Sequence, residues 1–138
     1  MVAGEVVGEI SGGLCVLIAI APQDDQRTVV WMARKLAALR IFEDESGKMN
    51  RSVIEAAGSI LLVSQFTLLA DASHGHRPSF IGAARPEQAD PLVQALAAQL
   101  RAGHGLRIEE GRFGAQMLVE LCNDGPVTII LDSPAEQG

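Results

Sequence analysis

The sequence predicts an α+β fold with a largely antiparallel sheet and two main helices. Short apolar, β-branched runs recur along the chain, as expected for strands. Two longer segments, 22–42 and about 86–101, change to helical spacing of their apolar residues. The strands thus come in runs, interrupted by two helices at unequal spacing, and this order favours antiparallel pairing over a doubly wound parallel sheet.

Length and composition predict one globular domain, residues 1–138, in the cytosol. With 48% hydrophobic and 20% charged residues, 138 residues can bury a substantial core. No run approaches the ~18 to 20 apolar residues of a membrane span, and the N-terminus lacks the basic residues of a signal peptide. The net charge of −6 disfavours broad contact with a nucleic-acid backbone, and 4% aromatic residues are too few for a base-stacking platform. Cys15 and Cys122 lie in apolar runs, which predicts two buried, reduced thiols.

The N-terminal third predicts a hairpin, a strand and a helix. Residues 2–10, "VAGEVVGEI", form a hairpin that turns near Gly4, and "GLCVLIAI" (13–20) is a short continuous run typical of a buried strand. In the segment 22–42, acidic residues precede the helical pattern and basic residues follow it, which suits the helix dipole. The core-facing stripe of this helix comprises Val29, Met32, Ala33, Leu36 and Leu39.

The middle of the chain predicts a turn, a second strand and a second helix. "FEDESGKMNRSV" (42–53) is turn chemistry around Ser46-Gly47, and "SILLVSQFTLLA" (59–70) is again typical of a buried strand. The second helix runs from about Pro86 to Arg101. Proline near its first turn and Gly103 past its end follow the usual asymmetry of helix termini.

Three closing strands are expected at 106–111, 115–122 and 127–132, the first of them weak. The pair Gly125-Pro126 precedes the last of these runs. Proline removes a ladder hydrogen bond and glycine weakens a strand, so both belong at the first residue of a strand, an edge or a bulge. The pair therefore predicts a rigid corner with few side chains, placed for a purpose other than strand pairing.

The sequence lacks the standard motifs of a serine nucleophile elbow, a zinc protease, a P-loop and a dinucleotide-binding fold. His74 and His76 flank a glycine without partner carboxylates or thiols, so no metal and no cofactor is predicted.

Polar residues interrupt the apolar strand 59–70. Alternation places Gln65 and Thr67 on one face, and Ser64 and Phe66 on the other. Buried polar groups need partners, so one face could line a pocket; local bonding of the hydroxyls to the backbone is the alternative.

One loop is locally basic on an acidic protein. The segment "ASHGHRPSFIGAAR" (72–85) holds Arg77, Arg85, His74 and His76 and no acidic residue. The loop is either a contact for RNA or an ordinary solvated surface segment.

Four segments together resemble the D-aminoacyl-tRNA deacylases, editing enzymes that hydrolyse D-amino acids from tRNA. The resemblance runs in order from about Val2 to Ser133. It is carried by "RIFEDESGKMNRSV" (40–53), "SQFTL" (64–68), "RPSF" (77–80) and "NDGPVT" (123–128).

The resemblance implies a barrel-like core and a homodimer that binds the 3′ acceptor end of tRNA, with the active site at the subunit interface. It assigns the catalytic segment to Ser64, Gln65, Phe66 and Thr67. The main-chain N–H groups around Phe66 and Thr67 would polarise the ester carbonyl, and the 2′-hydroxyl of the terminal adenosine would assist the attacking water. A threonine without an adjacent base is a poor nucleophile, so Thr67 is expected to orient and not to attack.

The resemblance also explains the corner. In the family the Gly-Pro bond is cis, which would turn two carbonyls toward the α-ammonium of the substrate while the backbone excludes an L side chain. A D side chain, or the hydrogen of a glycyl group, would escape this exclusion. The chiral selection would fall to Gly125 and Pro126 with their neighbours Asn123, Val127 and Thr128. RNA contact is expected at Arg77, Pro78 and Arg85.

Family members usually begin with a strand that precedes the 2–10 hairpin, and this first strand is expected to be absent here, leaving an exposed sheet edge. The predicted function is proofreading in translation by D-aminoacyl-tRNA hydrolysis. The alternatives are a non-catalytic nucleic-acid-binding dimer on the same scaffold, its activity lost with that strand, and a small-ligand-binding protein.

Overall fold

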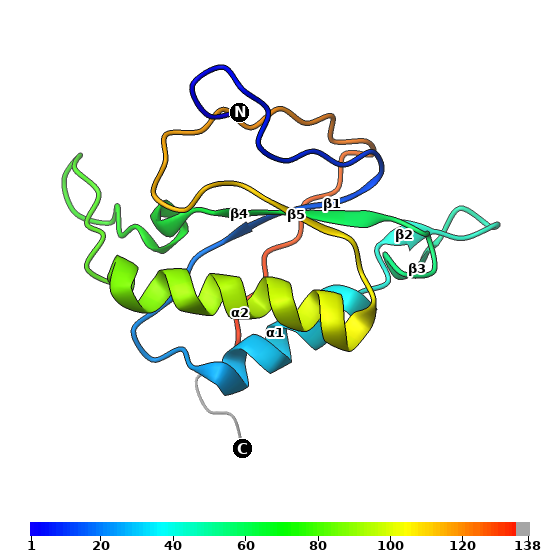
Figure 1. The fold of residues 1–138 in the computed structure, drawn as a ribbon, viewed down its shortest axis with the longest axis horizontal. Helices are drawn as coiled ribbons and strands as arrows, with labels where there is room; N and C mark the ends of the chain where they lie inside the picture. Colours follow the sequence, from blue (N-terminus) through cyan, green and yellow to red (C-terminus); the bar gives the residue numbers. More distant parts are fainter. Residues whose placement is uncertain (135–138) are drawn as a thin grey trace.

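The computed structural model describes residues 1–134. The described elements, in chain order, are β1 (Gly13–Ile18), α1 (Gln26–Ala38), β2 (Phe42–Glu43), β3 (Met49–Arg51), β4 (Ser59–Ser64), the 3-10 helix η1 (Phe66–Leu69), α2 (Pro86–His104) and β5 (Ile108–Glu110). They form a mixed α/β fold with two helices, as expected. In Figure 1 both helices lie on one face of the sheet, while the N-terminal segment and the first part of the chain after β5 cross the other face. The last described residues then run back to the side of the helices, where Leu131 packs against the core.

The main sheet is parallel, and the prediction of a largely antiparallel sheet is wrong. Its three strands have the order β1-β4-β5, and both neighbouring pairs run in the same direction. The chain returns from the end of β1 to the start of β4 through α1, and from β4 to β5 through α2, which is the connection that parallel neighbours require. Antiparallel pairing between named strands is confined to β2 and β3. The described strands do not form a closed barrel.

Both helices are confirmed. Asp25 caps α1 through a reciprocal pair of hydrogen bonds with Thr28, and the stripe residues Val29, Ala33 and Leu36 are buried. The second helix ends later than expected, because Gly103 lies inside it. The left-handed residue that ends α2 is Gly105, at φ 65°.

The core lies between the helices and the sheet. Ile60 and Leu62 of β4 and Leu96 and Leu100 of α2 are at most 2% exposed. Neither helix in the described residues has the length and apolar character of a membrane span.

The strand β1 is buried on one side only. Ile18 faces the core, whereas Leu17 is 43% exposed and Cys15 is also exposed, because the helices cover a single face of the sheet. Cys122 is exposed as well. The two thiols are free, as predicted, but the prediction that they are buried is wrong.

Two turns are confirmed, and two strands are not. The N-terminal chain turns at Ala3-Gly4, where Val2 pairs with Glu5, and the β2–β3 hairpin turns at Ser46-Gly47. Residues 115–122 and 127–132 were expected to form strands, but neither is a strand in the described structure. A strand needs a partner with free backbone groups. Among residues 1–134 the first segment pairs with a distant part of the chain only through Leu118 and Met1, and the N–H of Ala115 donates to the nearby carbonyl of Arg112 in a local turn.

Candidate functional site

The strand β4 ends at Ser64, and the chain then enters the 3-10 helix η1. The expected strand 59–70 is therefore shorter, and the alternation of faces fails beyond Gln65. The main-chain N–H of Gln65 donates to the carbonyl of Ile18 at 2.7 Å, and Ile18 is the last residue of β1. Because β1 ends at Ile18, the chain after Gln65 has no neighbouring strand among the described residues to pair with. It forms a 3-10 turn instead, in which the N–H of Leu68 donates to the carbonyl of Gln65.

The polar side chains of this segment lie at the surface and not inside the core. Ser64 and Gln65 are half-buried, whereas Phe66 and Thr67 are exposed. The Nε2 of Gln65 donates to the Oγ1 of Thr67 at 2.5 Å, so these two residues are neighbours even though they do not share a strand face. No hydrogen bond from the N–H groups of Phe66 and Thr67 is found within residues 1–134. Free donors are typical of the first turn of a helix.

A closed loop follows η1 and carries the predicted RNA contacts. The backbones of Asp71 and Ser79 pair in both directions, at 2.7 and 2.8 Å. The Oγ and N–H of Ser73 donate to the Asp71 carboxylate, and the hydroxyl bond is the main reason why the pKa of Asp71 lies below its ordinary value of 3.8. Arg77 and Pro78 are exposed on this loop.

Arg85 lies at the base of the same segment, as the N-terminal cap residue of α2, and its side chain is exposed. It forms a surface ion pair with Glu87 at 3.5 Å. Such exposed pairs are weak, so Arg85 can exchange Glu87 for another anion at little cost.

Phe80 contacts Phe66, and this contact was missed in the sequence, where Phe80 counted only as part of the "RPSF" motif. The two ring centroids are 5.1 Å apart, with an edge-to-face angle of 72°. Nothing in the residue spacing indicated the pair, because the loop 71–79 lies between the two rings.

The Gly125-Pro126 corner is an exposed turn held by one side chain. Its peptide bond is cis, and Gly125 has φ 132°. The Oδ1 of Asn123 accepts a hydrogen bond from the N–H of Val127 at 3.1 Å, and its Nδ2 donates to the Oγ1 of Thr128 at 3.1 Å. A Cβ on Gly125 would lie 3.0 Å from Cγ2 and 3.1 Å from N of Val127, so a side chain there would disturb this arrangement.

The two segments are not joined within one chain. Among the described residues, no hydrogen bond or ring contact links residues 64–67 to residues 123–128. Each segment instead presents its polar groups to the surface.

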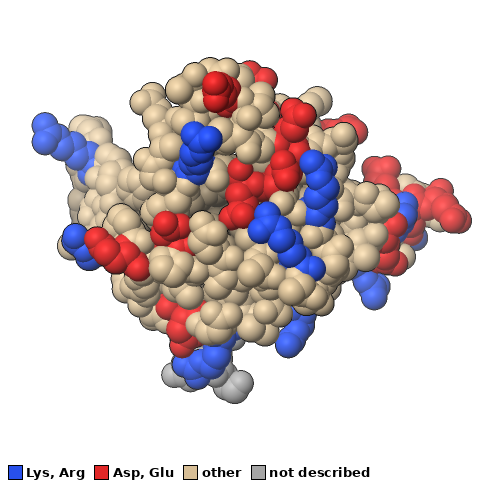
Figure 2. Space-filling model, viewed as in Figure 1, with Lys and Arg blue, Asp and Glu red and all other residues tan. Residues whose placement is uncertain are grey.

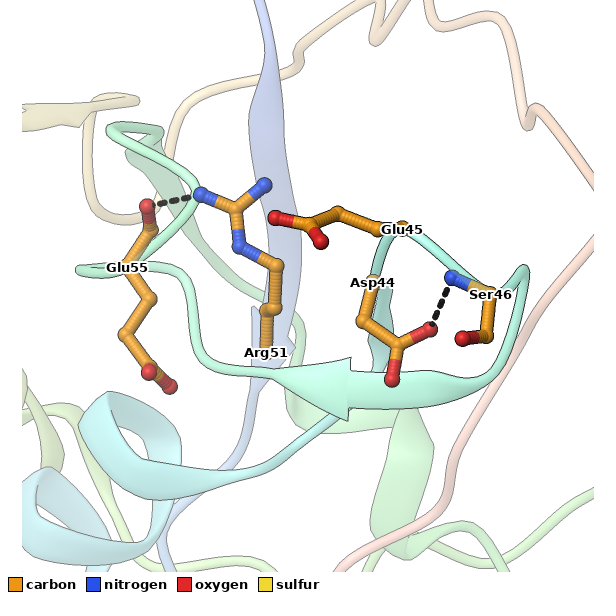
Figure 3. Close-up of a pocket in the computed structure, with 5 residues that line it drawn as sticks. All are labelled: Asp44, Glu45, Ser46, Arg51 and Glu55. Carbon is orange, nitrogen blue, oxygen red and sulfur yellow. Dashed lines mark hydrogen bonds between the residues drawn. The ribbon is translucent and has the colours of Figure 1, made fainter.

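A shallow hollow of about 330 Å³ lies at the β2–β3 hairpin, and none of its lining residues belongs to either segment. It is lined by Asp44, Glu45, Ser46, Arg51 and Glu55 (Figure 3). The guanidinium of Arg51 donates to the main-chain carbonyl of Glu55, and Asp44 accepts the N–H groups of Ser46 and Lys48. The polar groups of the hollow are thus used in hydrogen bonds with nearby backbone. The residues described contain no cluster of three His, Cys, Asp or Glu that could hold a metal ion.

Surface charge is mixed on the face drawn in Figure 2, where acidic side chains gather over the β2–β3 hairpin at the right. Basic side chains are interspersed with acidic ones elsewhere on this face. The described residues of this face therefore carry no broad basic surface of the kind that binds a nucleic-acid backbone.

Known proteins resemble this chain over nearly its whole length. The family model described as D-Tyr-tRNA(Tyr) deacylase matches residues 1–132. A D-aminoacyl-tRNA deacylase of Symbiobacterium thermophilum is 55% identical over 132 residues, which are 96% of this chain and 87% of the relative. One of Brevibacillus brevis is 56% identical, covering 96% and 90%.

Two solved structures share the fold. A protein described as c-Myc DNA Unwinding Element Binding Protein superposes with a TM-score of 0.90 at 44% identity, over 97% of this chain and 91% of the other. A probable eukaryotic D-amino acid tRNA deacylase superposes with a TM-score of 0.62 at 16% identity, over 74% and 75%, and this likeness shows the fold alone. On the match of the family model and the identity to these relatives, the chain belongs to the D-Tyr-tRNA(Tyr) deacylase family of hydrolases.

Proposed function

We propose that this protein hydrolyses the ester bond of D-aminoacyl-tRNA in the cytoplasm and so removes D-amino acids from translation. The observation that carries the proposal is the match over residues 1–132, which includes both the Ser-Gln-Phe-Thr segment and the Gly-Pro corner. Water attacks the ester carbonyl, the bond between the acyl carbon and the ribose oxygen breaks, and that oxygen leaves as the tRNA hydroxyl. The products are a free amino acid and tRNA.

The catalytic segment would act by polarising the carbonyl. The unpaired N–H groups of Phe66 and Thr67 are suited to an oxygen that gains negative charge, and one such donor contributes roughly 3 to 4 kcal/mol to an acyl-transfer transition state. The hydrogen bond from Gln65 leaves the Thr67 hydroxyl proton available to orient water or substrate. Since neither side chain is a base at neutral pH, the proton of the attacking water would pass with help from the 2′-hydroxyl of the tRNA.

The Gly125-Pro126 corner would select the chirality of the substrate. Gly125 presents backbone without a side chain, and its neighbour Val127 is fixed by Asn123, so a substrate α-carbon could approach closely. An L side chain would then meet the backbone, whereas a D side chain or a glycyl hydrogen would not. We include glycyl-tRNA among the substrates on this reasoning.

The corner and the catalytic segment would meet across a homodimer interface. Support comes from large apolar side chains that lie at the surface of the single chain. Leu118 and Leu121 are 59% and 60% exposed, and Ile130 is 86% exposed. A group of exposed apolar residues on one chain is typical of a surface that is buried in an assembly. Residues 115–122 and 127–132 would find a partner there.

The test compares three esters that differ only at the α-carbon. D-aminoacyl-tRNA, its L counterpart and glycyl-tRNA are incubated with the protein, and the loss of ester is followed. Hydrolysis of the D ester and the glycyl ester with sparing of the L ester is expected. Equal rates for the D and L esters would contradict the selective role of the corner, and no hydrolysis of any ester would contradict the activity.

A second candidate is non-catalytic nucleic-acid binding. It is favoured by the description of the relative with a TM-score of 0.90 as a DNA unwinding element binding protein. Binding of nucleic acid without ester loss in the same assay would support it.

A further inference from the structure

The segment η1 has little support from the core. None of its residues is buried, and Phe66 is 57% exposed although its side chain is large and apolar. A 3-10 turn of four residues is weak on its own, since its hydrogen bonds have poor geometry. The direction of the N–H groups of Phe66 and Thr67 therefore depends on contacts from outside the segment.

Phe80 supplies such a contact. Its ring meets that of Phe66 edge-on at 5.1 Å and 72°, a geometry that aromatic pairs prefer. This is the one aromatic pair found among the described residues, and both of its members are exposed to solvent, at 57% and 40%.

The backbone of Phe80 is itself fixed on both sides. The two hydrogen bonds between Asp71 and Ser79 close the loop immediately before it, and the N–H of Ala83 donates to its carbonyl at 3.1 Å immediately after it. These hydrogen bonds fix the backbone of Phe80 beside η1, where its ring meets that of Phe66.

We propose that Phe80 is a positioning residue, whose ring holds Phe66 so that the N–H groups of Phe66 and Thr67 point at the ester carbonyl. Phe80 acts through Phe66 and does not itself touch the reacting atoms. The proposal rests on the proposed deacylase function and adds a residue that the catalytic segment does not contain.

The test is Phe80→Ala, with Phe80→Tyr as the rescue and Ile81→Ala as the matched control. Ile81 is the next residue, is 92% exposed and has no ring contact, so its truncation removes apolar surface from the same loop without touching Phe66. Loss of the ring pair should lower kcat on D-aminoacyl-tRNA roughly 2- to 10-fold with KM unchanged. Phe80→Tyr should restore kcat, and Ile81→Ala should leave it at the wild-type value.

Amide hydrogen exchange gives a second readout that is independent of activity. The N–H groups of Leu68 and Ala70 close η1 by donating to Gln65 and Thr67, and they should exchange faster in Phe80→Ala than in Ile81→Ala. An unchanged kcat in Phe80→Ala, a raised KM with unchanged kcat, or a kcat in Phe80→Tyr as low as in Phe80→Ala would overturn the proposal. An inactive wild-type protein would instead contradict the deacylase function, and the exchange rates alone would then decide whether Phe80 restrains the segment.

Discussion

Asn123 offers the most direct test of how the Gly125-Pro126 corner is held. Its side chain spans the corner, with Oδ1 accepting from the N–H of Val127 and Nδ2 donating to the hydroxyl of Thr128, each at 3.1 Å. Asn123→Ala removes both hydrogen bonds and leaves the backbone sequence of the corner intact. We expect the corner to lose order and the enzyme to lose discrimination between D and L esters.

The magnitude follows from the two bonds. A typical hydrogen bond contributes about 0.5 to 1.5 kcal/mol net, so the pair contributes about 1 to 3 kcal/mol to the local order of the corner. If all of it served selection, the ratio of D to L hydrolysis would fall roughly 5- to 150-fold. Residues 121–130 are exposed, so the melting temperature should change little.

The assay measures kcat/KM for the D and L esters of one tRNA in three variants. Asn123→Asp keeps an oxygen for the Val127 N–H and should retain most of the selectivity, whereas Thr128→Val removes the second bond alone and should give an intermediate loss. Full selectivity in Asn123→Ala would refute the reasoning, because the corner would then be held without these hydrogen bonds.

Three further predictions concern the loop and the core. Replacing Arg77 and Arg85 by glutamine should weaken tRNA binding and leave the ratio of D to L hydrolysis unchanged. In a salt titration, the slope of log K against log salt concentration should fall by roughly 0.7 to 0.9 for each phosphate contact that is lost. An unchanged slope would mean that the loop is only a solvated surface. Leu100→Ala should lower the free energy of unfolding by about 2 to 5 kcal/mol in a denaturant titration, since Leu100 is fully buried, and a loss below about 1 kcal/mol would contradict its place in the core. The hydrogen bonds from Ser73 hold the pKa of Asp71 below 3.8, so the charged form stabilises the fold above that pH and its contribution is lost as the pH falls through the lowered pKa. Asp71→Asn should therefore lose less stability than the wild-type protein as the pH falls below 3.8. Identical acid titrations of the two proteins would count against this.

The sequence alone identified the features that depend on neighbours along the chain. Both helices, the turn at Ser46-Gly47 and the starts of two strands were predicted from periodicity and turn chemistry, because the residues that decide them lie within a few positions of one another. The family was also recognised from the sequence, since its four motifs are linear segments.

The tertiary structure decided what depends on distant partners. The parallel order β1-β4-β5 arises from pairings between segments separated by a helix, and the residues of a strand do not specify which distant strand it pairs with. Cys15 is exposed because the helices cover one face of the sheet only. Residues 115–122 have side chains that favour a strand, but they do not form one because no neighbouring strand within residues 1–134 is there to accept their backbone hydrogen bonds. The contact between Phe66 and Phe80 has the same origin: the pairing of Asp71 with Ser79 folds the loop back, and only that closure brings the two rings together.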